Sequence, residues 1–316
     1  MAWHACGADG MGEQPHPLGD LKALDTADGS LTLHSCHFDE AFHSSAGALA
    51  EAEAKFVAPA ELDRFAPSRP LRVLDVCVGL GYNSAALMEA QLKIPSLHLQ
   101  WWGLELDSRP LALALNHRPF VELWSAPVRK RLQALSDRGL WNDQSSSGTM
   151  LWGDARHQQR KLRQEFKVDL VLMDAFSPSR CPELWSEEFL HALAGHLAPG
   201  GRLLTYSRAA AVRSSLRRAG LELRSLLPAP GQRNEWSSGT LASRPNPQQP
   251  LPEYGPGWRP FSPMEEDHLN TRAAVPYRDP EGEDCAAAIQ ERRIREQQHC
   301  GLPSTSSWQR RWFPSR

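Results

Sequence analysis

The sequence predicts an α/β fold in which a mainly parallel sheet is covered by helices on both faces. Apolar, strand-like runs alternate with helical patterns from about residue 71 to about residue 243. The runs are apolar almost throughout, which is typical of strands that are buried on both faces. The last two runs, 220–228 and 235–243, are joined by the loop APGQRN, which is too short for a crossover helix. We therefore expect this pair to be antiparallel within an otherwise parallel sheet.

The individual elements follow from local composition and from the glycines and prolines that end them. The expected strands are 71–77, 99–106, 149–155, 168–174, 201–207, 220–228 and 235–243. The expected helices are 83–92, 108–117, 186–198 and 209–220. A seven-stranded sheet with one antiparallel strand matches the Rossmann-like plan of S-adenosylmethionine-dependent methyltransferases. A dinucleotide-binding domain would be parallel throughout.

Composition divides the chain into three parts. Residues 1–27 have no regular apolar pattern and are expected to form a flexible leader, and residues 28–243 form the α/β domain. Residues 244–316 form a tail, which begins with a proline-rich stretch that predicts an extended linker. The tail continues with a polar helix over 286–298 and ends with a segment rich in tryptophan and arginine.

The composition indicates a cytoplasmic protein. No stretch approaches the ~20 apolar residues of a membrane span, and the first residues lack the pattern of a signal peptide. The six cysteines form no CxxC pair, so neither a metal cluster nor a disulfide framework is expected. Because the formal net charge is −2, any binding of nucleic acid must come from local basic patches.

Residues suited to a ligand follow the carboxyl ends of the expected strands, where ligands bind in open α/β sheets. Asp75 precedes a turn with Gly79 and Gly81, and a helix begins near Asn83. Glycines let a ligand approach the backbone closely, and a helix N-terminus offers free N–H groups. The other candidates at strand ends are Glu105, Asp154, Asp174 and the pair Ser207-Arg208.

The pattern favours S-adenosylmethionine over a dinucleotide. A dinucleotide fingerprint has a third glycine where this chain has Ser84. S-adenosylmethionine has no pyrophosphate and is recognised instead by acids, which hold its ribose, its adenine amine and its charged amino-acid group. Glu105 is placed to accept both hydroxyls of a ribose. A single acid at a strand end is more often a turn residue, but the combination at successive strand ends favours a site.

Four segments together resemble the methyltransferase domain of the MnmC family, which makes 5-methylaminomethyl-2-thiouridine at the tRNA wobble position. They are DGSLTLHSCHFDEAFHSSAGALAEAEAKFV, VCVGLGYNS, MDAFSPSRCPELWS and LAPGGRLLTYSRAAAVRSSLRRAG. The third carries the most specific signature, Asp-x-Phe-x-Pro followed by Pro-x-x-Trp. The resemblance covers about residues 28–243. Cys77 stands where the family usually has glycine, and the tail has no counterpart in the fusion form's methyltransferase domain.

The resemblance implies a standalone tRNA methyltransferase without the flavin-dependent oxidase domain of the fusion form. It implies that Asp174 holds the substrate ammonium and accepts or relays its proton, while Phe176 stacks on the flipped uracil. Pro178 would fix the turn that presents both residues, and His43 would close over the cofactor or lie in a surface loop. The substrate would be the anticodon loop of tRNA after other enzymes have added the aminomethyl group.

Basic patches are the candidate contacts to tRNA, although solvated helix faces have the same composition. Arg208 and Arg233 lie in loops and are the least easily explained as helix surface. The other candidates are Arg156, Arg160, Lys161, Arg163, Lys167, Arg213, Arg217, Arg218, Arg292, Arg293, Arg295, Arg310 and Arg311. Two alternative functions remain open at this point: a methyl- or aminopropyltransferase that acts on a small amine, and a non-catalytic Rossmann module that binds RNA.

Overall fold

The computed structural model describes residues 16–26, 29–43, 47–65, 69–144, 146–162, 165–228 and 236–313. Its centre is a nine-stranded sheet. In spatial order the strands are β12 (Trp258–Arg259), β10 (Glu222–Leu226), β11 (Gly239–Ser243), β9 (Leu197–Thr205), β8 (Val168–Met173), β4 (Leu71–Val76), β5 (Leu99–Glu105), β7 (Ser146–Trp152) and β6 (Leu140–Asn142).

The sheet topology confirms the predicted fold class. Strands β9, β8, β4, β5 and β7 are paired in parallel, and β11 runs antiparallel to both β9 and β10. After β4 the chain builds outward through β5 to β7 and then returns to place β8 on the other side of β4. The strand order therefore reverses between β4 and β8, and a ligand crevice is expected at their carboxyl ends.

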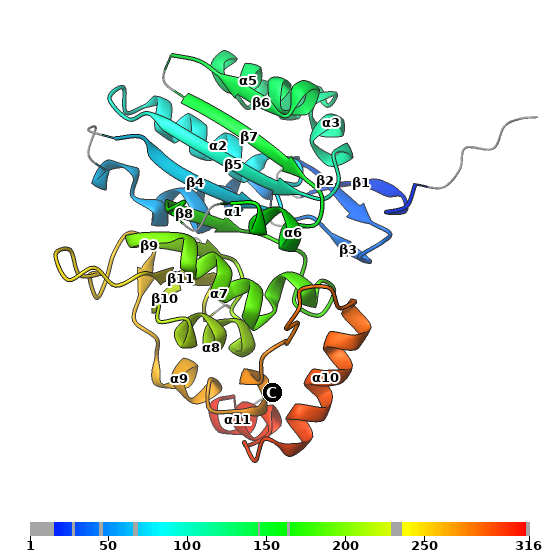
Figure 1. Ribbon diagram of the computed structural model, residues 1–316, viewed down its shortest axis with the longest axis vertical. Coiled ribbons are helices and arrows are strands. Elements are labelled where there is room, and N and C mark those ends of the chain that lie inside the picture. Colours follow the sequence, from blue (N-terminus) through cyan, green and yellow to red (C-terminus); the bar gives the residue numbers. More distant parts are fainter. Residues whose placement is uncertain are drawn as a thin grey trace, which may run out of the picture.

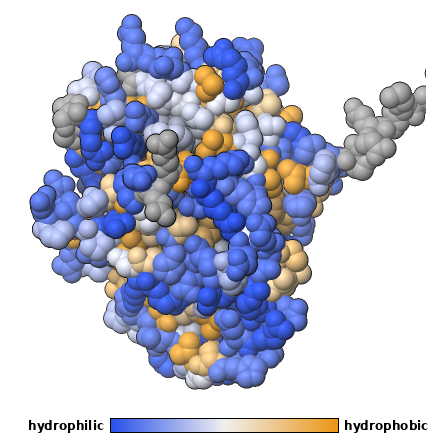
Figure 2. All heavy atoms as spheres, in the orientation of Figure 1, coloured by the Kyte–Doolittle hydropathy of each residue, from blue (hydrophilic) through white to orange (hydrophobic). Residues whose placement is uncertain are grey.

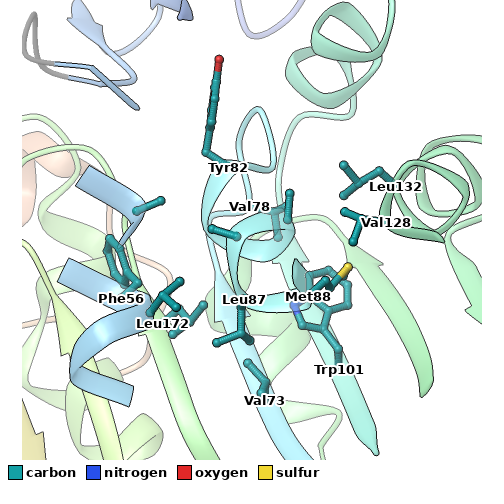
Figure 3. Packing of buried hydrophobic residues seen from close by; sticks show 14 of the residues in the cluster. Phe56, Val73, Val78, Tyr82, Leu87, Met88, Trp101, Val128, Leu132 and Leu172 are labelled. Atoms are coloured by element: carbon teal, nitrogen blue, oxygen red, sulfur yellow. The ribbon is translucent and has the colours of Figure 1, made fainter. Parts of the chain in front are cut away.

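Helices cover both faces of the sheet. They are α2 (Tyr82–Leu92), α3 (Arg109–Leu115), α4 (Arg118–Glu122), α5 (Ala126–Arg138), α6 (Ala155–Arg160), α7 (Glu187–His196) and α8 (Ala210–Arg218). Alternate side chains of β4 enter two separate cores: Val73 packs in one with Trp101, and Val76 packs in the other with Trp185. Figure 3 shows the first core, where Val73, Leu87 and Trp101 meet beneath α2.

Several elements were not predicted from the sequence. The sheet gains the short edge strands β6 and β12, and the region between the second and third predicted strands holds α4 and α5 in addition to α3. The segment expected as a leader contributes β1 (Leu21–Asp25), which pairs with β2 (Leu31–Ser35). Strand β2 pairs in turn with β3 (Glu40–Ala41) to form a small second sheet. In Figure 1 the arrowheads of β4, β5 and β7 point toward this sheet.

A helical segment of unusual geometry follows the small sheet. It consists of α1 (Ala48–Ala52), a π-helical turn (Glu53–Val57) and the 3-10 turns Ala58–Ala60 and Leu62–Arg64. The apolar side of this segment anchors it, since Ala52 and Phe56 are buried in the first core. A π turn inside a helix is often found at a functional site.

The tail packs on the α/β domain. Residues 244–257 contain no helix or strand, as the prolines predict. Beyond them lie β12, α9 (Pro263–His268), the 3-10 turn Arg272–Ala274, α10 (Ala286–His299) and α11 (Thr305–Trp312), which form the lower end of the molecule in Figure 1. Helix α10 confirms the helix predicted over 286–298. Ile289 of α10 is completely buried and Trp308 of α11 is 6% exposed, so both helices are docked by apolar contacts.

A buried ion pair joins the tail to the sheet. Arg213 of α8 donates to the Glu265 carboxylate of α9 at 3.0 Å, and the two side chains are 1% and 0% exposed. The same guanidinium donates to Thr240 Oγ1, Ser237 Oγ and the Gly239 carbonyl. Glu265 also completes a capping box with Ser262 at the start of α9. One interaction therefore fixes both the start of α9 and its place against β11.

Polar side chains cover most of the face seen in Figure 2, and apolar residues appear there only in scattered groups. Within the described part of the chain, no helix has the length and apolar character that crossing a membrane requires.

We predict that Glu265→Gln lowers the free energy of unfolding by about 3–5 kcal/mol, because it leaves the Arg213 charge buried without its partner. The neighbouring Glu266 pairs with Arg217 on the surface, where both side chains are nearly half exposed. Glu266→Gln makes the same chemical change and should cost at most about 1 kcal/mol. Urea denaturation of both variants checks this, and equal losses would mean that the buried pair does not anchor the tail.

Candidate active site

A cavity of about 1770 Å³ opens at the carboxyl edge of the sheet. Its walls come from the ends of β4, β5, β8 and β9, from the small sheet, from the π-helical segment and from α11 of the tail. Ligand pockets of small-molecule enzymes usually measure about 300–1,000 Å³. The cavity is therefore large enough for a cofactor together with part of a larger substrate.

The turn after β4 brings the backbone to the cavity wall. Gly79 lines the cavity with φ +55°, and a Cβ atom there would lie 3.1 Å from the Phe42 ring. Gly81, with φ +92°, caps the N-terminus of α2 but does not belong to the described lining. Cys77 also lines the cavity and has φ 67°, a left-handed conformation that costs a side-chain-bearing residue about 1–2 kcal/mol. This conformation gives a physical reason why glycine suits the position of Cys77.

Glu105 lies at the end of β5 with its carboxylate facing the cavity. Its two oxygens accept the backbone N–H groups of Gly79, at 2.8 Å, and Asp107, at 2.9 Å. Burial raises the pKa of Glu105, and these backbone hydrogen bonds oppose the rise. Because a carboxylate has about four acceptor positions, it can still receive two ribose hydroxyls. The structure places Glu105 at a strand end on the cavity wall, and its contact with a ribose stays a prediction.

Asp154 follows β7 as the N-cap of α6, and its side chain accepts from the Arg156 backbone N–H. The Arg156 guanidinium donates to Asp154 at 2.7 Å and to Asp279 of the tail at 2.8 Å. Asp279 is completely buried. Arg156, which the sequence suggested as an RNA contact, also lines the cavity, and its two ion pairs fix Asp154 at the cavity wall.

Asp174 directly follows β8 and lines the cavity. The Asn83 side-chain amide donates to Asp174 Oδ2 at 2.6 Å, which joins the strand-end acid to the start of α2. Burial raises the pKa of Asp174 to about 6, while the Asn83 hydrogen bond and the Lys55 charge oppose the rise. Because this pKa lies just below neutral pH, the carboxylate is mostly ionised at neutral pH and can readily accept a proton.

Glu51 and Lys55 also line the cavity, and the sequence analysis did not single them out as site residues. Glu51 lies in α1 and Lys55 in the π-helical turn that follows it, and their side chains form an ion pair at 2.9 Å. Lys55 acts electrostatically on Asp174, as does Glu51 with the opposite sign. The glutamate-rich stretch before Phe56 was the available signal, but only the tertiary structure shows that it faces Asp174.

The loop after Asp174 carries an aromatic wall. The Phe176 ring stacks on Phe38 at 4.6 Å between centroids and meets the edge of Phe42 at 4.9 Å. Pro178 lines the cavity two residues further on. The Phe176 carbonyl accepts from the indole N–H of Trp185, which is completely buried and therefore has the packing role expected from its position.

The small sheet holds the other side of this loop. Glu40 of β3 accepts from both the backbone N–H and the hydroxyl of Ser177. His43 lines the cavity, with its ring edge-on to Tyr82 and its backbone N–H bonded to Thr32 Oγ1. The sequence left two positions open for His43, over the cofactor or in a surface loop. The structure places His43 at the cavity wall.

Asp75 lies elsewhere than the sequence suggested. It belongs to β4 itself, is completely buried and does not belong to the described cavity lining. The Ser84 hydroxyl of α2 donates to its Oδ2 at 2.5 Å. Burial raises the pKa of Asp75 to about 7. Asp75 therefore supports the glycine turn from behind, and the expected direct contact with a cofactor does not follow from its position.

Of the two arginines proposed for tRNA, one can be placed. Arg208 lines the cavity, donates to the Ser237 carbonyl at 2.8 Å and lies 5.2 Å from the centre of the Trp236 ring. Arg233 lies outside the described residues. Among the described residues, no group of three or more His, Cys, Asp and Glu side chains is arranged to hold a metal ion.

Comparison with known proteins agrees with this geometry. Residues 120–241 match the model of an S-adenosyl-L-methionine-dependent methyltransferase family. The chain is 34% identical over 203 residues to the bifunctional tRNA 5-methylaminomethyl-2-thiouridine biosynthesis protein MnmC of Azoarcus sp., and 32% identical over 195 residues to an uncharacterised protein of Methanocaldococcus jannaschii. These matches cover 61% of the chain in each case, but only 31% and 52% of the two relatives.

The crystal structure of MnmC2 from Aquifex aeolicus is similar over nearly the whole chain. The TM-score is 0.73 at 29% identity, and the match covers 91% of this chain and 86% of the other. A match of that extent reaches well beyond Ser243. Part of the tail therefore has a structural counterpart in this relative.

We predict that the unliganded protein loses stability as pH rises from about 5 to about 8. The pKa of Asp75 is about 7 in the folded state against 3.8 when unperturbed, so the folded state holds the proton more tightly. The stabilisation is complete below about pH 4 and is lost as pH rises through about 7.

Asp75→Asn removes this titration. As pH rises from 5 to 8, the free energy of unfolding of the variant should increase by about 2–3 kcal/mol relative to that of wild type. Denaturation at both pH values measures the gain, with the exposed Asp137→Asn as a matched control. A difference between variant and wild type that does not change with pH would show that Asp75 is not a desolvated acid.

Proposed function

We propose that this chain, which carries an MnmC-like methyltransferase domain, transfers a methyl group from S-adenosyl-L-methionine to the aminomethyl nitrogen of 5-aminomethyl-(2-thio)uridine at the tRNA wobble position. The observation that carries the proposal is Asp174, a partly buried acid at the cavity wall between Asn83 and an aromatic loop. The enzyme would act in the cytoplasm, after other enzymes have built the aminomethyl group.

The residues at one end of the cavity fit the cofactor. Glu105 has acceptor capacity for ribose hydroxyls, Asp154 is fixed at the wall by Arg156, and Gly79 leaves the backbone open to close approach. S-adenosyl-L-methionine, when bound, supplies a methyl group on a positively charged sulfur. A wall that carries the carboxylates of Glu105, Asp154 and Asp174 favours such a cation, since the positive charge offsets the cost of their partial desolvation.

Asp174 is the group that would handle the substrate amine. A free alkylamine is protonated at neutral pH, like a lysine, and must lose a proton before its lone pair can react. The Asp174 carboxylate would hold the ammonium by a charge-assisted hydrogen bond and then accept or relay its proton. Asn83 keeps this carboxylate oriented by donating to Oδ2, which leaves Oδ1 for the substrate.

The aromatic loop would orient the base. Phe38, Phe42 and Phe176 form one packed aromatic group beside Asp174, and Pro178 restricts the turn that follows. Bases that enter an enzyme pocket are commonly held by stacking on aromatic rings. Positioning the amine in line with the methyl group would supply much of the rate enhancement.

We predict that tRNA from cells that lack the gene accumulates the unmethylated aminomethyl nucleoside, while the methylaminomethyl nucleoside disappears. Nucleoside mass spectrometry measures both, and a plasmid copy of the gene should restore the wild-type profile. An unchanged profile would contradict the proposal. Transfer of labelled methyl to small amines but not to bulk tRNA would point instead to a small-amine transferase, and failure to bind S-adenosylmethionine in calorimetry to a non-catalytic module.

We predict that Asp174→Asn lowers turnover at least ~10²-fold while affinity for S-adenosylhomocysteine stays within several-fold, because the amide keeps the size of the side chain but cannot accept the proton. In wild type, kcat/KM should fall with decreasing pH through about pH 6, where Asp174 is protonated. Asp137→Asn, an equivalent change at an exposed position, serves as the control. A near-normal rate for Asp174→Asn would remove this side chain from the chemistry.

A further inference from the structure

We propose that the Glu40 carboxylate accepts a hydrogen bond from N3–H of the substrate uracil, and that this contact makes the enzyme act on uridine and not on cytidine. The inference rests on the proposed function and deepens it, since it names the residue that recognises the base. Glu40 lines the same cavity as Asp174 but belongs to β3 of the small sheet, and no step of the proposed methyl transfer uses it.

The two oxygens of the Glu40 carboxylate differ in what they contact. Oε2 accepts from the Ser177 backbone N–H at 2.9 Å and from the Ser177 hydroxyl at 2.8 Å. Within the described part of the chain, Oε1 has no hydrogen-bond partner, and Glu40 is only partly buried. The protein therefore fixes the carboxylate through one oxygen and leaves the other available to a ligand in the cavity.

The segment that carries Glu40 is attached to the aromatic wall on both sides of that residue. Phe38, before Glu40, stacks on Phe176 at 4.6 Å between ring centroids, and Phe42, after it, meets the edge of the same ring at 4.9 Å. Glu40 itself pairs with Ser35 in the small sheet. These contacts keep the carboxylate in one place relative to the ring on which the base would stack.

Glu40 and Asp174 also lie close to one another along the loop after β8. The Tyr206 hydroxyl donates to the Ala175 carbonyl at 2.9 Å. Burial raises the pKa of Tyr206, and the charges of Asp174 and Glu40 add to the rise, so both carboxylates act on this one hydroxyl. Because Glu40 holds Ser177, only three residues after Asp174, a base placed beside Asp174 has Glu40 nearby as well.

The chemistry of a carboxylate identifies the part of the base that Glu40 recognises. An ionised carboxylate only accepts hydrogen bonds, so it selects a ligand by its donors. In a uridine, the uracil ring has a single N–H group, N3–H, which lies between acceptor positions at C2 and C4. In cytidine the same ring position is an unprotonated nitrogen, whose lone pair would face the carboxylate.

An acceptor is needed here because stacking alone does not identify a base. Every base has a flat face that can stack on Phe176, so the aromatic wall is tolerant of sequence. Enzymes that take up a flipped base commonly read it by hydrogen bonds to its Watson–Crick edge. Glu40 supplies such a hydrogen bond, while Asp174 handles the aminomethyl group.

Glu40→Gln reverses the hydrogen-bonding character of the free oxygen with little change in size. The Ser177 backbone N–H can only donate, so it holds the amide oxygen and turns the amide NH₂ toward the cavity. That NH₂ group is a donor. It opposes N3–H of uracil and matches the unprotonated N3 of cytosine.

The test is transfer of labelled methyl from S-adenosyl-L-methionine to two synthetic RNA hairpins, which carry 5-aminomethyluridine or 5-aminomethylcytidine at the wobble position. Wild type should prefer the uridine hairpin. Glu40→Gln should lower the ratio of kcat/KM for the uridine hairpin over the cytidine hairpin at least ~10-fold. Dissociation constants of the two hairpins, measured by fluorescence anisotropy in the presence of S-adenosylhomocysteine, give the same ratio without turnover.

Two further variants separate recognition of the base from positioning of the loop. Asp39→Asn removes an exposed ion pair between the same two segments, Asp39 with Arg180 at 2.8 Å, and asparagine accepts the left-handed φ of 50° at this position. It should leave the ratio unchanged. Ser177→Ala removes one of the two hydrogen bonds to Glu40 Oε2, so it should lower kcat/KM for both hairpins alike.

A lowered ratio in Glu40→Gln alone would uphold the inference. If wild type methylates the uridine hairpin and Glu40→Gln loses activity on both hairpins equally, or keeps the wild-type ratio, the inference is overturned and the proposed function stands. An equal drop of the ratio in Asp39→Asn would overturn it as well. If wild type transfers methyl to neither hairpin, the proposed function fails and the inference fails with it.

Discussion

The site depends on keeping several carboxylates out of water at one edge of the sheet. Asp75, Glu105 and Asp174 are all buried or nearly so, and burial raises the pKa of each. They persist because each accepts hydrogen bonds from a fixed donor: the Ser84 hydroxyl, two backbone N–H groups and the Asn83 amide. Such an arrangement is costly without a cation, so the folded protein is preorganised for positively charged ligands.

The tail completes the site as a structural part of the domain. Through Asp279 it holds Arg156, which fixes Asp154 at the cavity wall. Through Glu265 it holds Arg213, which places α9 and the segments that follow it. The two ion pairs connect the tail to α6 and to α8. The match to MnmC2 from Aquifex aeolicus, which covers 91% of this chain, includes part of this tail.

The cavity lining combines carboxylates with arginines. Glu105, Asp154 and Asp174 line it together with Arg156, Arg208 and Arg310. The near-neutral total charge of the chain conceals this arrangement, because most surface arginines are paired with nearby carboxylates. The net charge of the chain is therefore a poor guide to the ligands that its cavity binds.

The sequence by itself determined the order of strands and helices, the glycine turn, and the acids Glu105, Asp154 and Asp174 at strand ends, because each of these depends on contiguous residues. Only the tertiary structure decided which side chains face the cavity and which cations are already paired. Asp75 turned toward α2 because it lies within β4, and Arg156 found a partner 123 residues away. Pairing at such separations depends on how the tail packs, and no local pattern in the chain specifies that packing.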